Sequence, residues 1–124
     1  MSELVKLFDA DFATVERSIR AALAERGFGI LTEIDVAATL KNKLGVNRSA
    51  LKILGACNPT FAHQALEIDP SVALFMPCNV VIEQLGDKVQ VSAMDPSIMM
   101  GSPETEAIAQ EAQRLLGEAV QSVE

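Results

Sequence analysis

The sequence predicts one α+β domain over residues 1–124, with a mainly antiparallel sheet and helices packed on one of its faces. Three observations lead to this prediction. A long amphipathic helix is expected near each end of the chain, over residues 11–26 and 103–122. Four strand patterns lie between these helices, at Phe28–Ile34, Leu51–Cys57, Cys78–Leu85 and Lys88–Met94. The last two strands flank Gly86-Asp87 closely, which is typical of an antiparallel hairpin.

The chain is expected to begin with a short edge strand at Leu4–Phe8, followed by the first long helix. Asp9-Ala10-Asp11 offers N-cap residues for this helix. Its apolar positions recur every three or four residues, at Phe12, Val15, Ile19, Ala22 and Leu23. Gly27 is expected to end the helix, because glycine is common just past a helix C-terminus.

The next segment predicts a strand and a second helix. In the strand, alternate residues share a face. The face that we expect to be buried carries Phe28, Ile30, Thr32 and Ile34. Asp35 is placed to cap the second helix, and Gly45 is placed to end it. The apolar stripe of this helix is Val36, Leu40 and Leu44.

The third strand, Leu51–Cys57, leads directly into a short helix. Asn58-Pro59 is a strong helix start, because asparagine is favoured at the N-cap and proline at the first helical position. This helix is expected to reach about Leu66, and Asp69-Pro70-Ser71 then forms a turn. The apolar run at 72–76 is too short to classify.

Residues 95–101 are expected to form a loop and to be the most mobile part of the chain, because glycine and proline flank them. Met94, Met99 and Met100 either line an adaptable surface or pack back on the sheet. Ser102-Pro103-Glu104 then opens the last helix. Its apolar stripe is Ile108, Ala112, Leu115, Leu116, Ala119, Val120 and Val123.

The overall charge and composition exclude several classes of function. The net charge of −7 argues against nucleic acid as a partner, because such binding draws on Lys and Arg. No apolar run approaches the roughly 20 residues of a membrane-spanning helix, so no membrane partner is expected. The N-terminus lacks the pattern of a signal peptide, which predicts a cytoplasmic protein. In the cytosol the two cysteines are expected to be thiols.

Four segments carry a family resemblance: residues 27–36 (GFGILTEIDV), 55–59 (GACNP), 74–81 (LFMPCNVV) and 94–96 (MDP). In them the sequence resembles the domain of unknown function 302 (DUF302) family, over nearly the whole chain. The resemblance implies an α+β fold related to the TATA-binding-protein-like fold, in prokaryotic proteins without an assigned activity. It supplies no catalytic residues, and a fold by itself does not imply DNA binding.

The two cysteines are the sharpest candidates for function. Cys57 precedes the expected helix N-terminus, where unpaired N–H groups and the helix dipole favour a thiolate. Cys78 begins a strand and shares a face with Val80 and Ile82. If the two strands are neighbours, both sulfurs can meet near the sheet edge. The alternative is that both residues are small buried hydrophobes.

A metal or polar ligand site is the next hypothesis. A soft metal would be held by Cys57, Cys78 and His63, with a methionine as a further ligand. The Cys-x2-4-Cys pairs of zinc sites are absent, and an exposed or capping histidine is the alternative. Asn58 and Asn79, each following a cysteine, are further candidates for ligand binding.

Asp95 completes the set of candidate ligand-binding residues. Carboxylate catalysis would require a second carboxylate at a fixed distance from it. The sequence does not choose among Glu33, Asp35 and Glu83. A turn aspartate is the alternative interpretation, because Asp95 lies between a strand and Pro96.

These observations leave two classes of function. The first is a non-catalytic ligand-binding or assembly module, with a cleft between the helix that begins after Asn58 and the loop at 95–101. The second is a thiol-dependent redox, soft-metal or cofactor-binding protein that uses Cys57 and Cys78. We favour the first, because neither cysteine has a neighbouring base or a Cys-x-x-Cys motif. A homodimer or larger homo-oligomer is also expected, since the apolar run at 72–76 can form an exposed patch. Activity and cofactor stay open.

Overall fold

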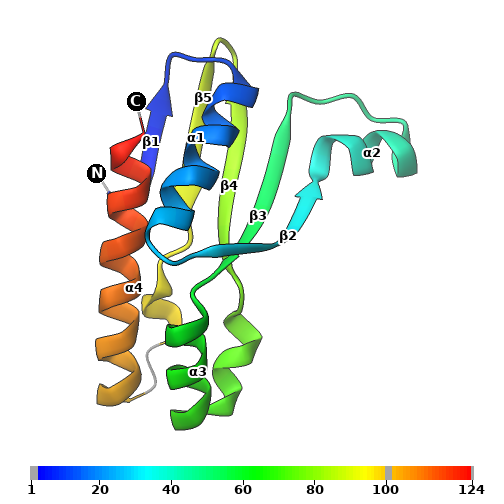
Figure 1. Cartoon of the computed structure of the whole chain (residues 1–124). Coiled ribbons are helices and arrows are strands. Elements are labelled where there is room, and N and C mark those ends of the chain that lie inside the picture. Colours follow the sequence, from blue (N-terminus) through cyan, green and yellow to red (C-terminus); the bar gives the residue numbers. More distant parts are fainter. Residues whose placement is uncertain (1–2, 100–101, 124) are drawn as a thin grey trace.

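The computed structural model describes residues 3–99 and 102–123, and in them the chain forms one five-stranded sheet (Figure 1). The strands are β1 (Val5–Phe8), β2 (Gly29–Asp35), β3 (Leu51–Cys57), β4 (Cys78–Leu85) and β5 (Lys88–Ala93). Their order is β1-β5-β4-β3-β2, and every neighbouring pair is antiparallel. The predicted α+β class with an antiparallel sheet is therefore confirmed.

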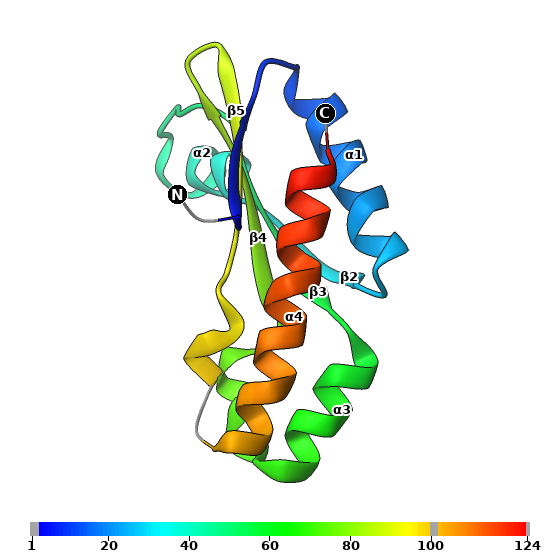
Figure 2. The same cartoon turned by 90° about the vertical axis from the view of Figure 1, so that its left-hand side faces the viewer.

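Two long helices cover one face of this sheet. The helices are α1 (Phe12–Glu25), α2 (Val36–Leu44), α3 (Pro59–Ile68) and α4 (Pro103–Ser122), and two short 3-10 helices are η1 (Pro70–Phe75) and η2 (Pro96–Met99). Figure 2 shows α1 and α4 side by side on the same face, as predicted. Helix α3 lies beyond one end of the sheet, where it packs on α4 and η1. No helix in the described part of the chain is long and apolar enough to cross a membrane.

The helices begin where the sequence predicts them, because a polar side chain satisfies the first free N–H groups. Asp11 accepts a hydrogen bond from the Thr14 N–H at 3.3 Å at the start of α1. Ser102 and Thr105 form a capping box at the start of α4. Helix α3 continues two residues beyond the predicted end and stops at Ile68.

The core lies between the sheet and the pair α1 and α4. Its largest fully buried side chains include Ile19, Leu23, Leu54, Ile82 and Leu116. The predicted stripe of α1 is buried at Val15, Ile19, Ala22 and Leu23. On α4, burial extends to Thr105, Ala109 and Gly117, which the apolar stripe did not include. Small side chains at these positions allow α4 to lie close to its neighbours.

The prediction that one face of β2 is buried is wrong for the second half of this strand. Phe28 is buried and Ile30 is half-buried, but Thr32 is exposed and Ile34 is 50% exposed. A β-bulge between Ile30 and Thr32 shifts the register against β3. Because β2 is also an edge strand, its end leaves the helical layer (Figure 1). Helix α2, which follows it, has no buried residue.

The apolar run at 72–76 forms most of η1 rather than a strand. Val72 is buried, whereas Leu74 is 83% and Phe75 is 41% exposed. The exposed pair is consistent with the patch expected from the sequence, and the homodimer stays a prediction. In the expected loop at 95–101, η2 forms and Pro96 is buried. Met100 and Gly101, and the side chain of Met99, lie outside the described residues.

Candidate functional site

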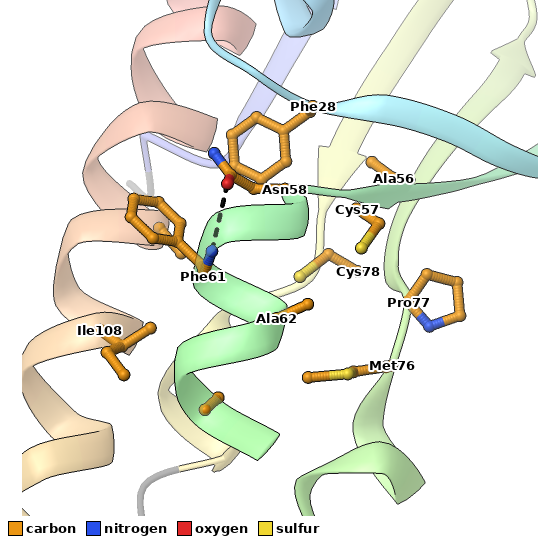
Figure 3. Close-up of a pocket in the computed structure, with 12 residues that line it drawn as sticks. Phe28, Ala56, Cys57, Asn58, Phe61, Ala62, Met76, Pro77, Cys78 and Ile108 are labelled. Atoms are coloured by element: carbon orange, nitrogen blue, oxygen red, sulfur yellow. Dashed lines mark hydrogen bonds between the residues drawn. The ribbon is translucent and has the colours of Figure 1, made fainter. Parts of the chain in front are cut away.

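A small pocket lies where β3 ends and β4 begins, between these strand ends, α3 and α4 (Figure 3). Its volume is about 40 Å³. The larger side chains of its wall are Phe28, Phe61, Met76, Pro77 and Ile108. None of the described residues that line the pocket carries a formal charge. The wall is therefore almost entirely apolar.

Both cysteines line this pocket as free thiols, and both are half-buried. Cys57 is the last residue of β3, and Cys78 is the first residue of β4. Ala56 is the residue that pairs with Cys78, so strict alternation would direct Cys57 to the opposite face. The pocket lies beyond the end of the sheet, where the two faces are no longer separated. Both side chains therefore reach it (Figure 3).

The electrostatic environment of the pocket keeps Cys78 protonated at neutral pH. Burial raises the pKa of the Cys78 thiol to about 11, and the nearby Cys57 adds to this shift. A catalytic thiol needs an adjacent base or cation to become a nucleophile. No Lys, Arg or His is among the described residues of the wall.

His63 lies away from both cysteines. Its side chain is 76% exposed on α3, and its Nε2 is 3.8 Å from Glu67 Oε1. The expected metal set of Cys57, Cys78 and His63 is therefore not brought together. In residues 3–99 and 102–123, no three His, Cys, Asp or Glu side chains form a group that could hold a metal.

Asn58 joins the cysteines at the pocket, where it has a clear structural role. Its Oδ1 accepts a hydrogen bond from the Phe61 N–H at 3.2 Å, which caps α3 (Figure 3). This cap holds the first turn of α3 directly beside Cys57. Replacing it would move one wall of the pocket.

Asn79 and Asp95 do not line the pocket. Asn79 is exposed and lies opposite Gly55 in the sheet. Asp95 Oδ1 accepts the Ser97 N–H at 2.9 Å, and its Oδ2 lies 3.5 Å from Gln113 Nε2. Asp95 thus has the turn role that was the alternative interpretation. The described part of the loop at 95–101 contributes nothing to the pocket wall.

Each carboxylate that was considered as a partner of Asp95 has another contact. Glu33 forms ion pairs with Arg20 and with Lys52. Asp35 caps α2 by accepting the Ala38 N–H at 2.9 Å. Glu83 Oε2 lies 3.0 Å from Arg48 Nη2. These contacts give no support to a carboxylate pair around Asp95.

A family model described as "Domain of unknown function DUF302" matches residues 5–123. The chain belongs to the DUF302 family. The crystal structure of an uncharacterized conserved DUF302 protein from Bacillus stearothermophilus has the same fold, with a TM-score of 0.87 and 23% identity over 98% of each chain. The comparison with curated proteins finds no match.

Most residues that line the pocket in this DUF302 domain were not predicted as site residues. Phe28 and Ile108 come from distant segments that were assigned to a buried strand face and a helix stripe. Both are apolar residues with ordinary periodicity, so their sequence pattern contains no signal for a site. Only Cys57, Asn58 and Cys78 were recognised, because their chemistry differs from that of a core residue.

We expect iodoacetamide to alkylate Cys57 at least about tenfold faster than Cys78 in the native protein at pH 8. With a pKa of about 11, only about one Cys78 side chain in a thousand is a thiolate at this pH. Cys57 lies at the other side of the strand pair, as the last residue of β3 and directly before the N-cap of α3. Peptide mass spectrometry after timed labelling measures both rates. Equal rates would contradict the expected order.

Proposed function

We propose that this DUF302 domain is a non-catalytic binding module, and that its ligand site is the pocket at the ends of β3 and β4. The observation that supports the proposal is the joint position of two thiols in an apolar wall. Thiols bind soft groups and metals, and the apolar wall excludes water from them. The absence of a base or cation among the described wall residues argues against thiol catalysis.

The size of the pocket limits what it can bind. Pockets for drug-sized ligands hold roughly 300–1,000 Å³, whereas this one holds about 40 Å³. A ligand of a few atoms fits, or one small group of a larger molecule. An organic cofactor would have to displace an element that lines the pocket, such as α3, to enter.

The test is native mass spectrometry of the protein, purified without oxygen or chelators. We expect one added mass per chain. Replacing Ala62, a small wall residue, by leucine should fill the pocket and remove this mass, because leucine adds no donor atom. Gln64→Leu introduces the same side chain at an exposed position of α3 and should keep it. A wild-type protein that carries no added mass would overturn the proposal.

The assembly part of the proposal is a homodimer in the cytoplasm. It is supported by the exposed Leu74 and Phe75 of η1, since apolar patches commonly mark interfaces. The two free thiols are consistent with a reducing compartment. The same native spectra report the oligomer, and a mass of one chain at high micromolar concentration would contradict the dimer.

A thiol-dependent protein is the second candidate, because both sulfurs line one pocket. The alkylation experiment separates it from a purely structural role for the cysteines. Rapid labelling of native Cys57 would support a functional thiol. If neither cysteine reacts until the protein is unfolded, both are core residues and this candidate is excluded.

A further inference from the structure

We propose that the pocket binds the soft monovalent cation Cu(I), with the sulfurs of Cys57 and Cys78 as its two protein ligands. This inference rests on the proposed function, because it requires that the pocket is a ligand site. It assigns a metal class to two residues that lie 21 positions apart in the chain and meet only in the folded domain.

The set of donor atoms selects the metal. Thiolate ligands prefer soft ions such as Cu(I), whereas Mg²⁺ and Ca²⁺ require several oxygen ligands. No Asp or Glu is among the described residues of the wall. Structural zinc sites use four ligands, and the described residues contain no group of three or more His, Cys, Asp or Glu that could hold a metal. Two sulfurs therefore fit an ion of low coordination number.

The dimensions and polarity of the pocket agree with this choice. A volume of about 40 Å³ accepts a single ion. Phe28, Phe61 and Ile108 line the same pocket as the cysteines, and this apolar surface keeps competing water away. Met76 also lines the pocket, but the proposed site does not require its thioether.

The charge of the bound state is also accommodated. Two thiolates and one Cu(I) carry a net charge of −1, which is costly in an apolar site unless a positive field faces it. Helix α3 begins directly after Cys57 and Asn58, and its ten residues present their N-terminus to the pocket. Pro59 has no N–H and the Phe61 N–H is bonded to Asn58 Oδ1, so it is the dipole of α3, rather than a set of free N–H groups, that favours an anion at this end of the helix.

Binding releases the thiol protons to solvent, and no electron is transferred. Two S–Cu bonds form as the S–H bonds are lost. Cys57 and Cys78 are the only titratable side chains among the described residues of the wall, so the released protons come from these two thiols.

The experiment is an anaerobic titration of the full chain with Cu(I), supplied as its bathocuproine disulfonate complex. We expect one Cu(I) per chain. Cys57→Ser and Cys78→Ser should each lower the affinity at least about a hundredfold, because one of the two ligands is lost. Met94→Leu is the control for a methionine that does not line the pocket, and it should bind as the wild type does.

A second measurement avoids any variant that fails to fold. Cu(I) should protect both Cys57 and Cys78 of the wild-type protein from iodoacetamide. Failure to take Cu(I) from the chelator, or labelling that Cu(I) does not slow, would overturn the metal assignment. If a different added mass is then lost in Ala62→Leu, the proposed binding function stands and only the metal is wrong. If neither copper nor another mass binds, both proposals fail.

Discussion

Leu116→Ala is expected to lower the free energy of unfolding by about 2–5 kcal/mol. Leu116 is fully buried, on the face of α4 that packs against the sheet and α1. Truncation removes most of a leucine side chain from the core and leaves a cavity that close-packed neighbours fill only in part. Urea denaturation followed by circular dichroism measures the change.

Leu115→Ala is the matched control for this experiment. Leu115 is the preceding residue of α4 and is only half-buried at the edge of the core. Both variants make the same chemical change in the same helix turn, so helix propensity cancels between them. We expect Leu115→Ala to cost less than half as much. Equal losses would show that α4 does not pack through Leu116.

Gly55→Ala is expected to destabilise the domain by about 1–3 kcal/mol, through crowding rather than through lost contacts. A Cβ atom on Gly55 would overlap Thr32 Oγ1 and would lie 2.7 Å from Pro77 Cγ. Thr32 is exposed and can turn away, but the proline ring is rigid. Because Pro77 lines the pocket, the same substitution should change the alkylation rate of Cys78.

Gly29→Ala provides the control in the neighbouring strand. A Cβ atom there would meet only the Cys57 carbonyl oxygen, at 3.9 Å, which is an ordinary contact. Its cost should stay within about 0.5 kcal/mol. Denaturant midpoints of both variants, together with Cys78 labelling, test the pair. A Gly55→Ala protein as stable as Gly29→Ala would contradict the close packing of β2, β3 and Pro77.

Local signals in the sequence determined the positions of the secondary structure elements. Asn58-Pro59 and Ser102-Pro103 each place a cap and a proline where a helix begins, and both helices begin there. Gly86, with a φ of 62°, lies in the predicted hairpin turn. These features are readable because the residues that create them are neighbours in the chain.

Local sequence signals did not determine which faces of the strands are exposed to solvent. The alternation in β2 predicted that Ile34 would be buried, but the bulge after Ile30 and the edge position of the strand expose it. Periodicity reports which residues share a face. It does not report which elements cover that face, because coverage depends on distant segments.

For the candidate site, too, the sequence predicted some features and only the tertiary structure decided the others. The chemistry of Cys57, Asn58 and Cys78 was visible in the sequence, and their proximity was expected only if their strands paired. The tertiary structure decided that β3 and β4 are neighbours and that Ala56 lies opposite Cys78. It also decided that His63 points to solvent and that Phe28 and Ile108 close the pocket. Such contacts depend on strand register and helix docking, which arise from the packing of the whole core.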